Sequence, residues 1–142
     1  MTWTTCLSKA SAFLDAKSVP DAAVAAELLM ARLLKTGRGF LASALDHEVS
    51  ERQLEAMRRG MARLVKGEPI QYVLGEWDFR TLTLTCDRRA LIPRPETEGL
   101  TRLALSSAER GDKILDLCTG SGAIAIALKK EGDKKNLNLQ VT

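Results

Sequence analysis

The sequence "DLCTGSGAIAIAL", residues Asp116 to Leu128, decides the fold class of the second half of the chain. It places Gly120, Gly122 and Ala125 at the spacing G-x-G-x-x-A, after the short apolar run KILDL and at the start of a helical apolar pattern. Glycines at such a turn let the backbone approach a ligand closely, and the helix N-terminus offers unpaired N–H groups. The pattern therefore predicts a strand, a ligand-binding loop and a helix.

The acidic residue before this loop bears on the kind of ligand. A dinucleotide enzyme carries small apolar residues before its first glycine and a ribose-binding acid about 20 positions later. Here Asp116 stands at the end of the strand, four residues before Gly120, as in the first motif of class I S-adenosylmethionine methyltransferases. Two plainer interpretations stay open: the glycines only make a tight turn, and Asp116 only caps nearby N–H groups. No base for a nucleophilic Cys118 is evident, so its backbone is the expected contributor.

The surroundings of the loop indicate a β-loop-α-β unit. We expect a helix over Glu96–Ala108, a buried strand over Lys113–Leu117, a helix over Gly122–Lys130 and a second strand over Leu137–Thr142. A parallel sheet needs cover on both faces and further strands. The sequence therefore predicts the beginning of a larger α/β domain, cut short in this chain.

The first part of the chain has helical periodicity instead. Helices are expected over Thr5–Asp15, Asp21–Lys35 and Ser50–Lys66, with a turn and a short helical stretch from Thr36. Ser50 and Gln53 have the spacing of a capping box, and an apolar stripe follows them. That stripe consists of Leu54, Met57, Met61, Leu64 and Val65. These patterns predict a small all-α bundle.

Between the two parts, the residues Ile70–Phe79 and Arg80–Asp87 alternate and predict two strands that turn near Arg80. The segment "LIPRPETE" follows, in which Pro93 and Pro95 favour an extended chain that enters the next helix. This segment could act as a stiff connection, as the wall of a pocket, or as both.

Composition sets the class of protein. The 142 residues are 45% apolar and 27% charged, with a formal charge of +3 and interspersed acids and bases. This balance is typical of a soluble globular chain and is not specific for nucleic acid. Three separated cysteines favour free thiols in a reducing, cytoplasmic compartment. No signal peptide or membrane span is evident, and the one histidine, His47, is expected at the surface.

Three segments in this order, GEPIQYVLGEWDF, LIPRPETE and ILDLCTGSGAIAIAL, resemble the release factor glutamine methyltransferases of the HemK/PrmC family, in their N-terminal half. The resemblance implies an all-α substrate-recognition bundle over 1–68 and a β-hairpin connector over 69–95. It also implies that 96–142 begin a Rossmann-like class I methyltransferase domain, incomplete here.

The resemblance further implies an activity. Members transfer a methyl group from S-adenosylmethionine to the side-chain amide (N5) of the glutamine in the Gly-Gly-Gln motif of release factors, without a metal. Their Asn-Pro-Pro-Tyr loop positions the amide, but the only prolines here are Pro20, Pro69, Pro93 and Pro95. We therefore expect no catalytic residue and no activity in this chain. The alternatives are a non-catalytic module that binds release factors and, less favoured, a dinucleotide-binding oxidoreductase fragment.

The resemblance also assigns residues. Those of the cofactor loop are Asp116, Cys118, Thr119, Gly120, Ser121 and Gly122, with Cys118 in place of the usual glycine. A side chain at Cys118 is tolerated if φ is negative. Weaker candidates for the pocket wall are Arg94, Glu96 and Thr97. For the remaining matches we favour packing over chemistry, with Trp77 and Phe79 buried between domains; the other such positions are Gln71, Tyr72, Leu74 and Gly75.

The polar face of the third helix carries Arg52, Arg58, Arg59, Arg63 and Lys66, alternating with Glu51 and Glu55. A solvated face with i,i+4 pairing accounts for this composition. The alternative is a face that docks on a release factor. The expected partners are release factors, with no membrane and no sequence-specific nucleic acid, and the chain is expected to be a monomer.

Overall fold

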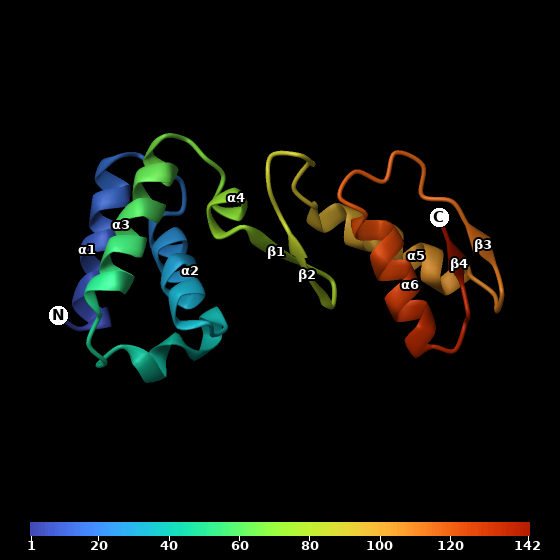
Figure 1. Cartoon of the computed structure of the whole chain (residues 1–142), viewed down its shortest axis with the longest axis horizontal. Coiled ribbons are helices and arrows are strands. Elements are labelled where there is room, and N and C mark those ends of the chain that lie inside the picture. The colour runs from blue at the N-terminus through green and yellow to red at the C-terminus, as the bar shows by residue number, and fades with distance from the viewer. The chain divides into compact units, whose positions relative to one another are not determined.

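The computed structural model describes every residue from Met1 to Thr142. The chain forms two compact units, Met1–Leu74 and Gly75–Thr142, and each is described by itself (Figure 1). Helices dominate the first unit, and the second combines helices with two small sheets. No helix has both the length and the apolar character needed to cross a bilayer.

The first unit is an all-α bundle, as the periodicity predicted. Three long helices lie where they were expected, and a 3-10 helix occupies the segment after the Thr36 turn. A fifth, shorter helix ends the unit. The helices are α1 (Trp3–Ala16), α2 (Ala22–Leu34), η1 (Arg38–Ala44), α3 (Glu51–Val65) and α4 (Ile70–Leu74).

The start of α3 confirms the predicted capping box. The Ser50 hydroxyl accepts a hydrogen bond from the Gln53 N–H at 3.3 Å, and Gln53 Oε1 accepts one from the Ser50 N–H at 3.0 Å. Two N–H groups that the helix leaves without partners are thereby satisfied. Of the predicted stripe, Met57 and Leu64 are buried, whereas Val65 is 38% exposed.

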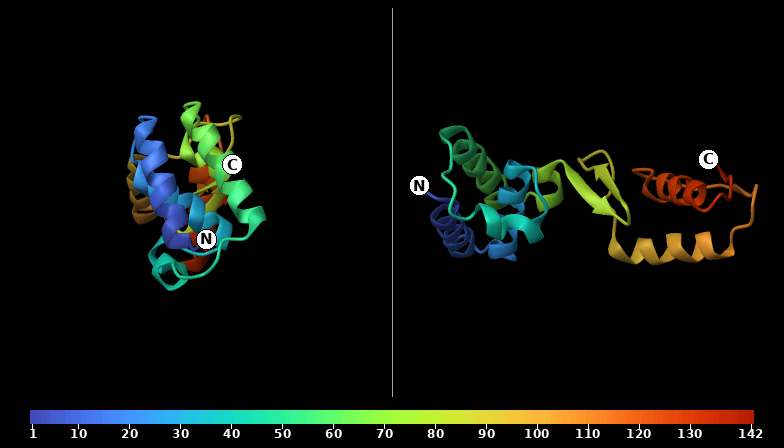
Figure 2. Two further views of the ribbon diagram at one scale, coloured as in Figure 1. Left: turned by 90° about the vertical axis from the view of Figure 1, so that its left-hand side faces the viewer. Right: turned by 90° about the horizontal axis from the view of Figure 1, so that it is seen from below.

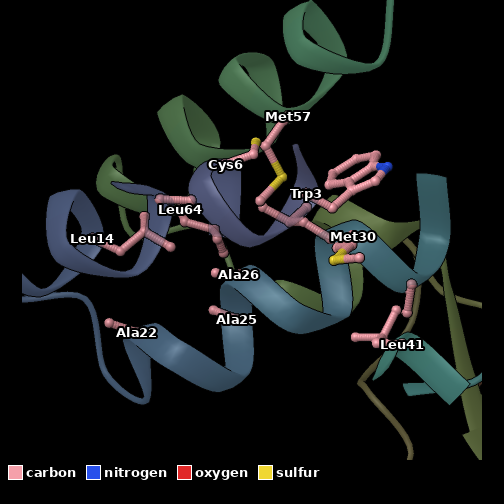
Figure 3. Packing of buried hydrophobic residues seen from close by; sticks show 13 residues of the cluster. Trp3, Cys6, Leu14, Ala22, Ala25, Ala26, Met30, Leu41, Met57 and Leu64 are labelled. Carbon is pink, nitrogen blue, oxygen red and sulfur yellow. The ribbon is translucent and has the colours of Figure 1, made fainter. Parts of the chain in front are cut away.

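The core of the bundle lies between α1, α2 and α3 (Figure 3). Trp3 and Leu14 of α1, Met30 of α2 and Met57 of α3 all lie in this core, and each of the four is at most 1% exposed. Burying side chains of this size contributes about 1.5–3 kcal/mol each. Small residues of α2, among them Ala25 and Ala26, let the helices approach closely.

The segment Ile70–Leu74 corrects the sequence prediction, because it forms the helix α4 and not a strand. The Tyr72 and Val73 N–H groups donate to the Pro69 carbonyl, at 3.0 and 3.1 Å. Arg63 of α3 donates to the carbonyls of Tyr72 and Val73, at 2.9 and 3.1 Å, and so caps α4. This contact comes from another helix and outweighs the local alternation, while Gly75 (φ +77°) ends the helical conformation.

The second unit begins with the predicted hairpin. Its strands pair antiparallel with Phe79 opposite Leu82, so the turn consists of Arg80 and Thr81. Phe79 is 1% exposed, and Trp77 is only half-buried. The elements of this unit are β1 (Glu76–Phe79), β2 (Leu82–Thr85), α5 (Pro95–Ser107), β3 (Lys113–Ile114), α6 (Ala123–Lys134) and β4 (Gln140–Val141).

The helix α5 follows the prediction closely. Pro95 is at its first turn, where a missing N–H costs nothing, and Glu96 and Glu98 also lie in the first turn. α5 packs beside α6 (Figure 2). Leu105 of α5, Leu128 of α6 and Leu139 form a buried cluster under these two helices.

The β-loop-α-β unit is present, since β3 and β4 pair in parallel with α6 between them in the chain. The prediction of a buried five-residue strand over Lys113–Leu117 is wrong. Only Lys113 and Ile114 form the strand, and Leu115 and Leu117 are 70% and 79% exposed. Apolar character predicted burial, but burial requires neighbouring elements that this two-stranded sheet does not have.

Candidate functional site

The loop between β3 and α6 has the backbone geometry that its glycines predicted. Gly120 (φ +59°) and Gly122 (φ +77°) both adopt the left-handed region, and Gly122 is the N-cap of α6. The Gly122 N–H donates to the Thr119 carbonyl at 2.9 Å, which closes the turn. A Cβ added to Gly120 would meet no atom nearer than the Cys118 carbonyl oxygen, at 4.0 Å. The loop therefore leaves space above Gly120.

The Asp116 carboxylate holds this loop in shape through hydrogen bonds. Its Oδ2 accepts hydrogen bonds from the Thr119 hydroxyl at 2.7 Å and from the Ala125 N–H at 3.1 Å. The carboxylate thus satisfies one of the unpaired N–H groups of the first turn of α6, where the helix dipole favours a negative charge. The capping interpretation of Asp116 describes this contact. A carboxylate with these contacts also fixes the shape of the loop for any ligand above it.

Cys118 departs from the sequence expectation. Its φ is +62°, whereas its tolerance in place of glycine was argued for a negative φ. A side chain in the left-handed region costs roughly 1–2 kcal/mol. All three cysteines are free thiols; that of Cys118 is exposed, and those of Cys6 and Cys86 are buried. Position 118 is therefore one where glycine suits the backbone better.

A cavity of about 300 Å³ opens beside the loop. Gly120 and Ser121 line one side of it, and the segment between β2 and α5 lines the other. This is at the lower end of the range of small-molecule pockets, about 300–1,000 Å³. The lining residues outside the loop are Thr85, Cys86, Asp87, Arg89, Ala90, Leu91 and Pro93.

The structure thus brings together part of the predicted site. Asp116, Cys118, Thr119 and Gly122 support the loop but do not line this cavity. The weaker candidates Arg94, Glu96 and Thr97 do not line it either. Arg94 and Glu96 are exposed, and Thr97 is half-buried with its carbonyl accepting from the Thr101 hydroxyl at 3.1 Å. A role for these three in ligand binding stays a prediction.

The part of the wall from Thr85 to Arg89 was missed by sequence reasoning, whereas the segment "LIPRPETE", which was expected as a pocket wall, contributes Leu91 and Pro93. Asp87 and Arg89 form an ion pair there, with Arg89 Nη2 at 2.6 Å from Asp87 Oδ2. The Arg89 side chain and its backbone N–H both donate to Asp87, which lowers the pKa of that carboxyl to about 2. The D-x-R spacing was the available signal. At neutral pH the pair presents a carboxylate and a guanidinium at the cavity, with the Arg89 side chain 85% exposed.

The basic face of α3 is exposed at all five predicted positions. Two of the arginines are engaged within the unit. Arg59 pairs with Glu55 one turn earlier, and Arg63 binds the Glu68 carboxylate in addition to the α4 carbonyls. The predicted i,i+4 pairing therefore holds for Arg59, whereas Arg63 pairs with a residue beyond the end of α3. His47 is exposed, as expected.

Comparison with known proteins shows the family of the chain. Residues 5–75 match the model of the PrmC N-terminal domain. The chain belongs to the PrmC family. The match to this PrmC domain covers nearly the whole helical unit and ends at Gly75, where the first strand is about to begin.

Similar full-length proteins are release factor glutamine methyltransferases. That of Chlorobaculum tepidum is 40% identical over 126 residues, which are 82% of this chain and 42% of the relative. That of Leptospira interrogans is 35% identical over 138 residues, 95% of this chain and 48% of the relative. That of Vibrio cholerae is 41% identical over 110 residues, which are 77% of this chain and 38% of the relative. The chain spans less than half the length of each of these curated relatives.

Proposed function

We propose that this chain serves as the N-terminal part of an S-adenosylmethionine-dependent methyltransferase that modifies the glutamine of the Gly-Gly-Gln motif in peptide chain release factors. The observation that carries the proposal is the combination of a PrmC N-terminal domain with a left-handed glycine loop that lines a cavity. In this proposal residues 1–68 recognise the substrate and 69–95 connect. Residues 96–142 begin a Rossmann-like domain.

The cofactor half of the proposal rests on Gly120 and Ser121. Both line the cavity, and the left-handed glycine keeps the backbone free of a side chain where a ligand would approach. The wall opposite carries Asp87 and Arg89, which offer charge of both signs to a ligand that has an amino acid part. These residues fit part of S-adenosylmethionine, whose sulfonium, when bound, supplies an electrophilic methyl group.

The substrate half of the proposal follows from the chemistry of amides. A glutamine side-chain nitrogen is a poor nucleophile because its lone pair is delocalised into the carbonyl. Methylation forms an N–C bond, breaks the S–C bond and releases one proton, so positioning of the amide is decisive. This chain contains no Asn-Pro-Pro-Tyr sequence. We therefore assign no catalytic residue within it and expect it to methylate nothing by itself.

Calorimetric titration with S-adenosylhomocysteine tests the cofactor half. Gly120→Ala adds a methyl group to a residue that lines the cavity, and this group meets no protein atom within 4 Å other than the Cys118 carbonyl oxygen. Gly67→Ala is a matched control, since Gly67 is also left-handed (φ +81°), also has open space, and lies in the other unit. We expect Gly120→Ala to abolish binding and Gly67→Ala to leave it unchanged. Equal affinities for both variants would contradict the assignment of the loop.

The same titration separates the alternatives. Heat on addition of NAD, and none with S-adenosylhomocysteine, would favour a dinucleotide-binding fragment. A pull-down with a release factor, combined with a methyl transfer assay, tests the binding-module alternative. Capture of the release factor without cofactor binding would support that alternative, and methyl transfer by the chain would overturn the expected inactivity.

A further inference from the structure

The hairpin of the second unit lies along one stripe of α6. Ala123, Ala127 and Glu131 are spaced by four residues and therefore face the same way. Phe79 and Leu82, which flank the hairpin turn, form a buried cluster with the two alanines. The third residue of the stripe, Glu131, is charged, and the hairpin turn contacts α6 there.

At that point Arg80 and Glu131 form a two-point ion pair. Arg80 Nε and Nη2 donate to the two carboxylate oxygens of Glu131, at 2.7 and 2.6 Å. The two side chains are only 18% and 11% exposed. Planar pairs of this kind fix both distance and orientation. The apolar contacts with the alanines, in contrast, do not specify a register by themselves.

Arg80 also binds α5. Its backbone N–H donates to Glu98 Oε1 and its Nη1 donates to the Glu98 carbonyl, both at 3.0 Å. One residue of the hairpin turn is thereby bonded to both helices of the unit.

The backbone at Arg80 favours a different residue. Its φ is +55°, and it is the first residue of a two-residue hairpin turn, where glycine is usual. A strained residue that persists in a turn suggests that its side chain has a use. At Arg80 that use is to bond the hairpin turn to Glu131 of α6 and to Glu98 of α5.

The elements that Arg80 joins are those whose ends border the cavity. β2 runs from the turn to Thr85, where the cavity wall begins, and α5 follows the last wall residue, Pro93. α6 follows Gly120 and Ser121 directly. A shift of the hairpin along α6 would therefore move one wall of the cavity past the other.

We propose that Arg80 is a positioning residue, which fixes the register of the hairpin on α6 through Glu131 and so holds the Thr85–Pro93 wall opposite the glycine loop at the distance that an adenosyl ligand requires. The inference rests on the cofactor site proposed above and deepens it. It assigns to the turn of the hairpin a part in cofactor affinity, although Arg80 does not line the cavity.

The test compares four forms of the chain by titration with S-adenosylhomocysteine. Arg80→Gly relieves the backbone but removes both contacts, and we expect a loss of affinity of roughly ten-fold or more, since small misplacements of positioning groups have effects of this order. Arg80→Lys keeps the charge without the planar fork and should lose less. The exchange Arg80→Glu with Glu131→Arg should restore most of the affinity. Unchanged affinity in Arg80→Gly would overturn the proposal, and so would a failure of the exchange to recover any of it in a folded protein.

A second measurement needs no ligand and keeps the two proposals distinct. In Glu131→Gln, amide exchange by NMR should accelerate at Cys86 and Gly122, whose N–H groups donate to the Gly75 and Thr119 carbonyls on the two sides of the cavity. A purely local role of the ion pair would change only the neighbours of Arg80 and Glu131, and that result would overturn the inference. If the unsubstituted chain binds no S-adenosylhomocysteine, the cofactor proposal fails while this measurement still decides whether Arg80 sets the cavity walls.

Discussion

Gly60 of α3 faces Leu29 of α2 so closely that a Cβ added to Gly60 would lie 2.7 Å from Cδ2 and 3.2 Å from Cδ1 of Leu29. Leu29 is 5% exposed and packs in the core of the bundle. In a close-packed interior, this side chain can move only by displacing its neighbours. The spacing of α2 and α3 therefore depends on the absence of a side chain at Gly60.

Gly60→Ala should destabilise the bundle. Overpacking costs about 1–3 kcal/mol, and the gain in helix propensity returns about 1 kcal/mol. We expect a net loss of about 1 kcal/mol in urea unfolding followed by Trp3 fluorescence, in a Trp77→Phe background. Gly39→Ala is the control, because Gly39 lies within η1 of the same unit with nothing within 4 Å, and it should cause no loss of stability. A Gly60→Ala bundle as stable as the original would show that α2 and α3 can separate at no cost.

Cys118→Gly should stabilise the second unit. It removes a side chain from a left-handed backbone, and the expected gain is about 1 kcal/mol. The fluorescence of Trp77, in a Trp3→Phe background, reports the unfolding of this unit. Asn136→Gly is a suitable comparison, since Asn136 (φ +58°) is also left-handed but asparagine tolerates that region better. A gain at Asn136 that equals or exceeds the gain at Cys118 would contradict the explanation.

The stability of the second unit should depend on pH through Glu131. The hydrogen bonds from Arg80 lower the pKa of this carboxyl below its usual value of 4.5. At low pH the unfolded chain then binds more protons than the folded one. The contribution of the ionised Glu131 carboxyl to the unfolding free energy is therefore complete above pH 4.5 and declines as pH falls through the pKa of the folded state. The difference in unfolding free energy between the original chain and Glu131→Gln should therefore shrink from pH 7 to pH 3.

Arg80→Met supplies the complementary pH experiment. Without the guanidinium, the mostly buried Glu131 carboxyl is easier to protonate in the folded state than in the unfolded one. The unfolding free energy of the variant should therefore lie furthest below that of the original chain near neutral pH, and the two values should approach each other in acid. A constant difference across this range would mean that the pair contributes nothing through charge.

The three thiols should react in a fixed order with a disulfide reagent at neutral pH. Cys118 is exposed, whereas Cys6 and Cys86 are each 4% exposed, and burial raises the pKa of both buried thiols. Cys118 should therefore react first in the folded protein. Cys6 should become reactive when the first unit unfolds and Cys86 when the second does, so labelling in rising urea reports each unit separately. Reaction of Cys86 as fast as Cys118 would indicate that the cavity wall opens in the native state.

Local patterns were enough to predict the elements that depend on local interactions. The Ser50 and Gln53 pair specified the start of α3, and Pro95 with two glutamates specified the start of α5. Each of these features acts within one turn of the helix it begins. The hairpin turn at Arg80 was predicted for the same reason, since its strands are adjacent in the chain.

Features that depend on distant residues were not predictable in this way. The helix α4 is capped by Arg63, ten residues before Val73, and no alternation pattern contains that contact. The cavity wall at Asp87 and Arg89 lies opposite Gly120 only because the hairpin packs on α6. The glycine loop itself was recognised from its spacing, but the left-handed backbone at Cys118 was not, because its residue type argued against it.

The leucines that follow β3 have a practical consequence. Leu115 and Leu117 present bare hydrocarbon to water beside a strand that pairs along only one of its edges. Such an edge is a template for the strand of any other chain that it meets. Concentrated samples should therefore cloud and bind hydrophobic dyes, and Leu115→Lys with Leu117→Lys should keep them clear. For anyone who purifies this protein, these two side chains are among the exposed apolar residues that limit the concentration at which it stays in solution.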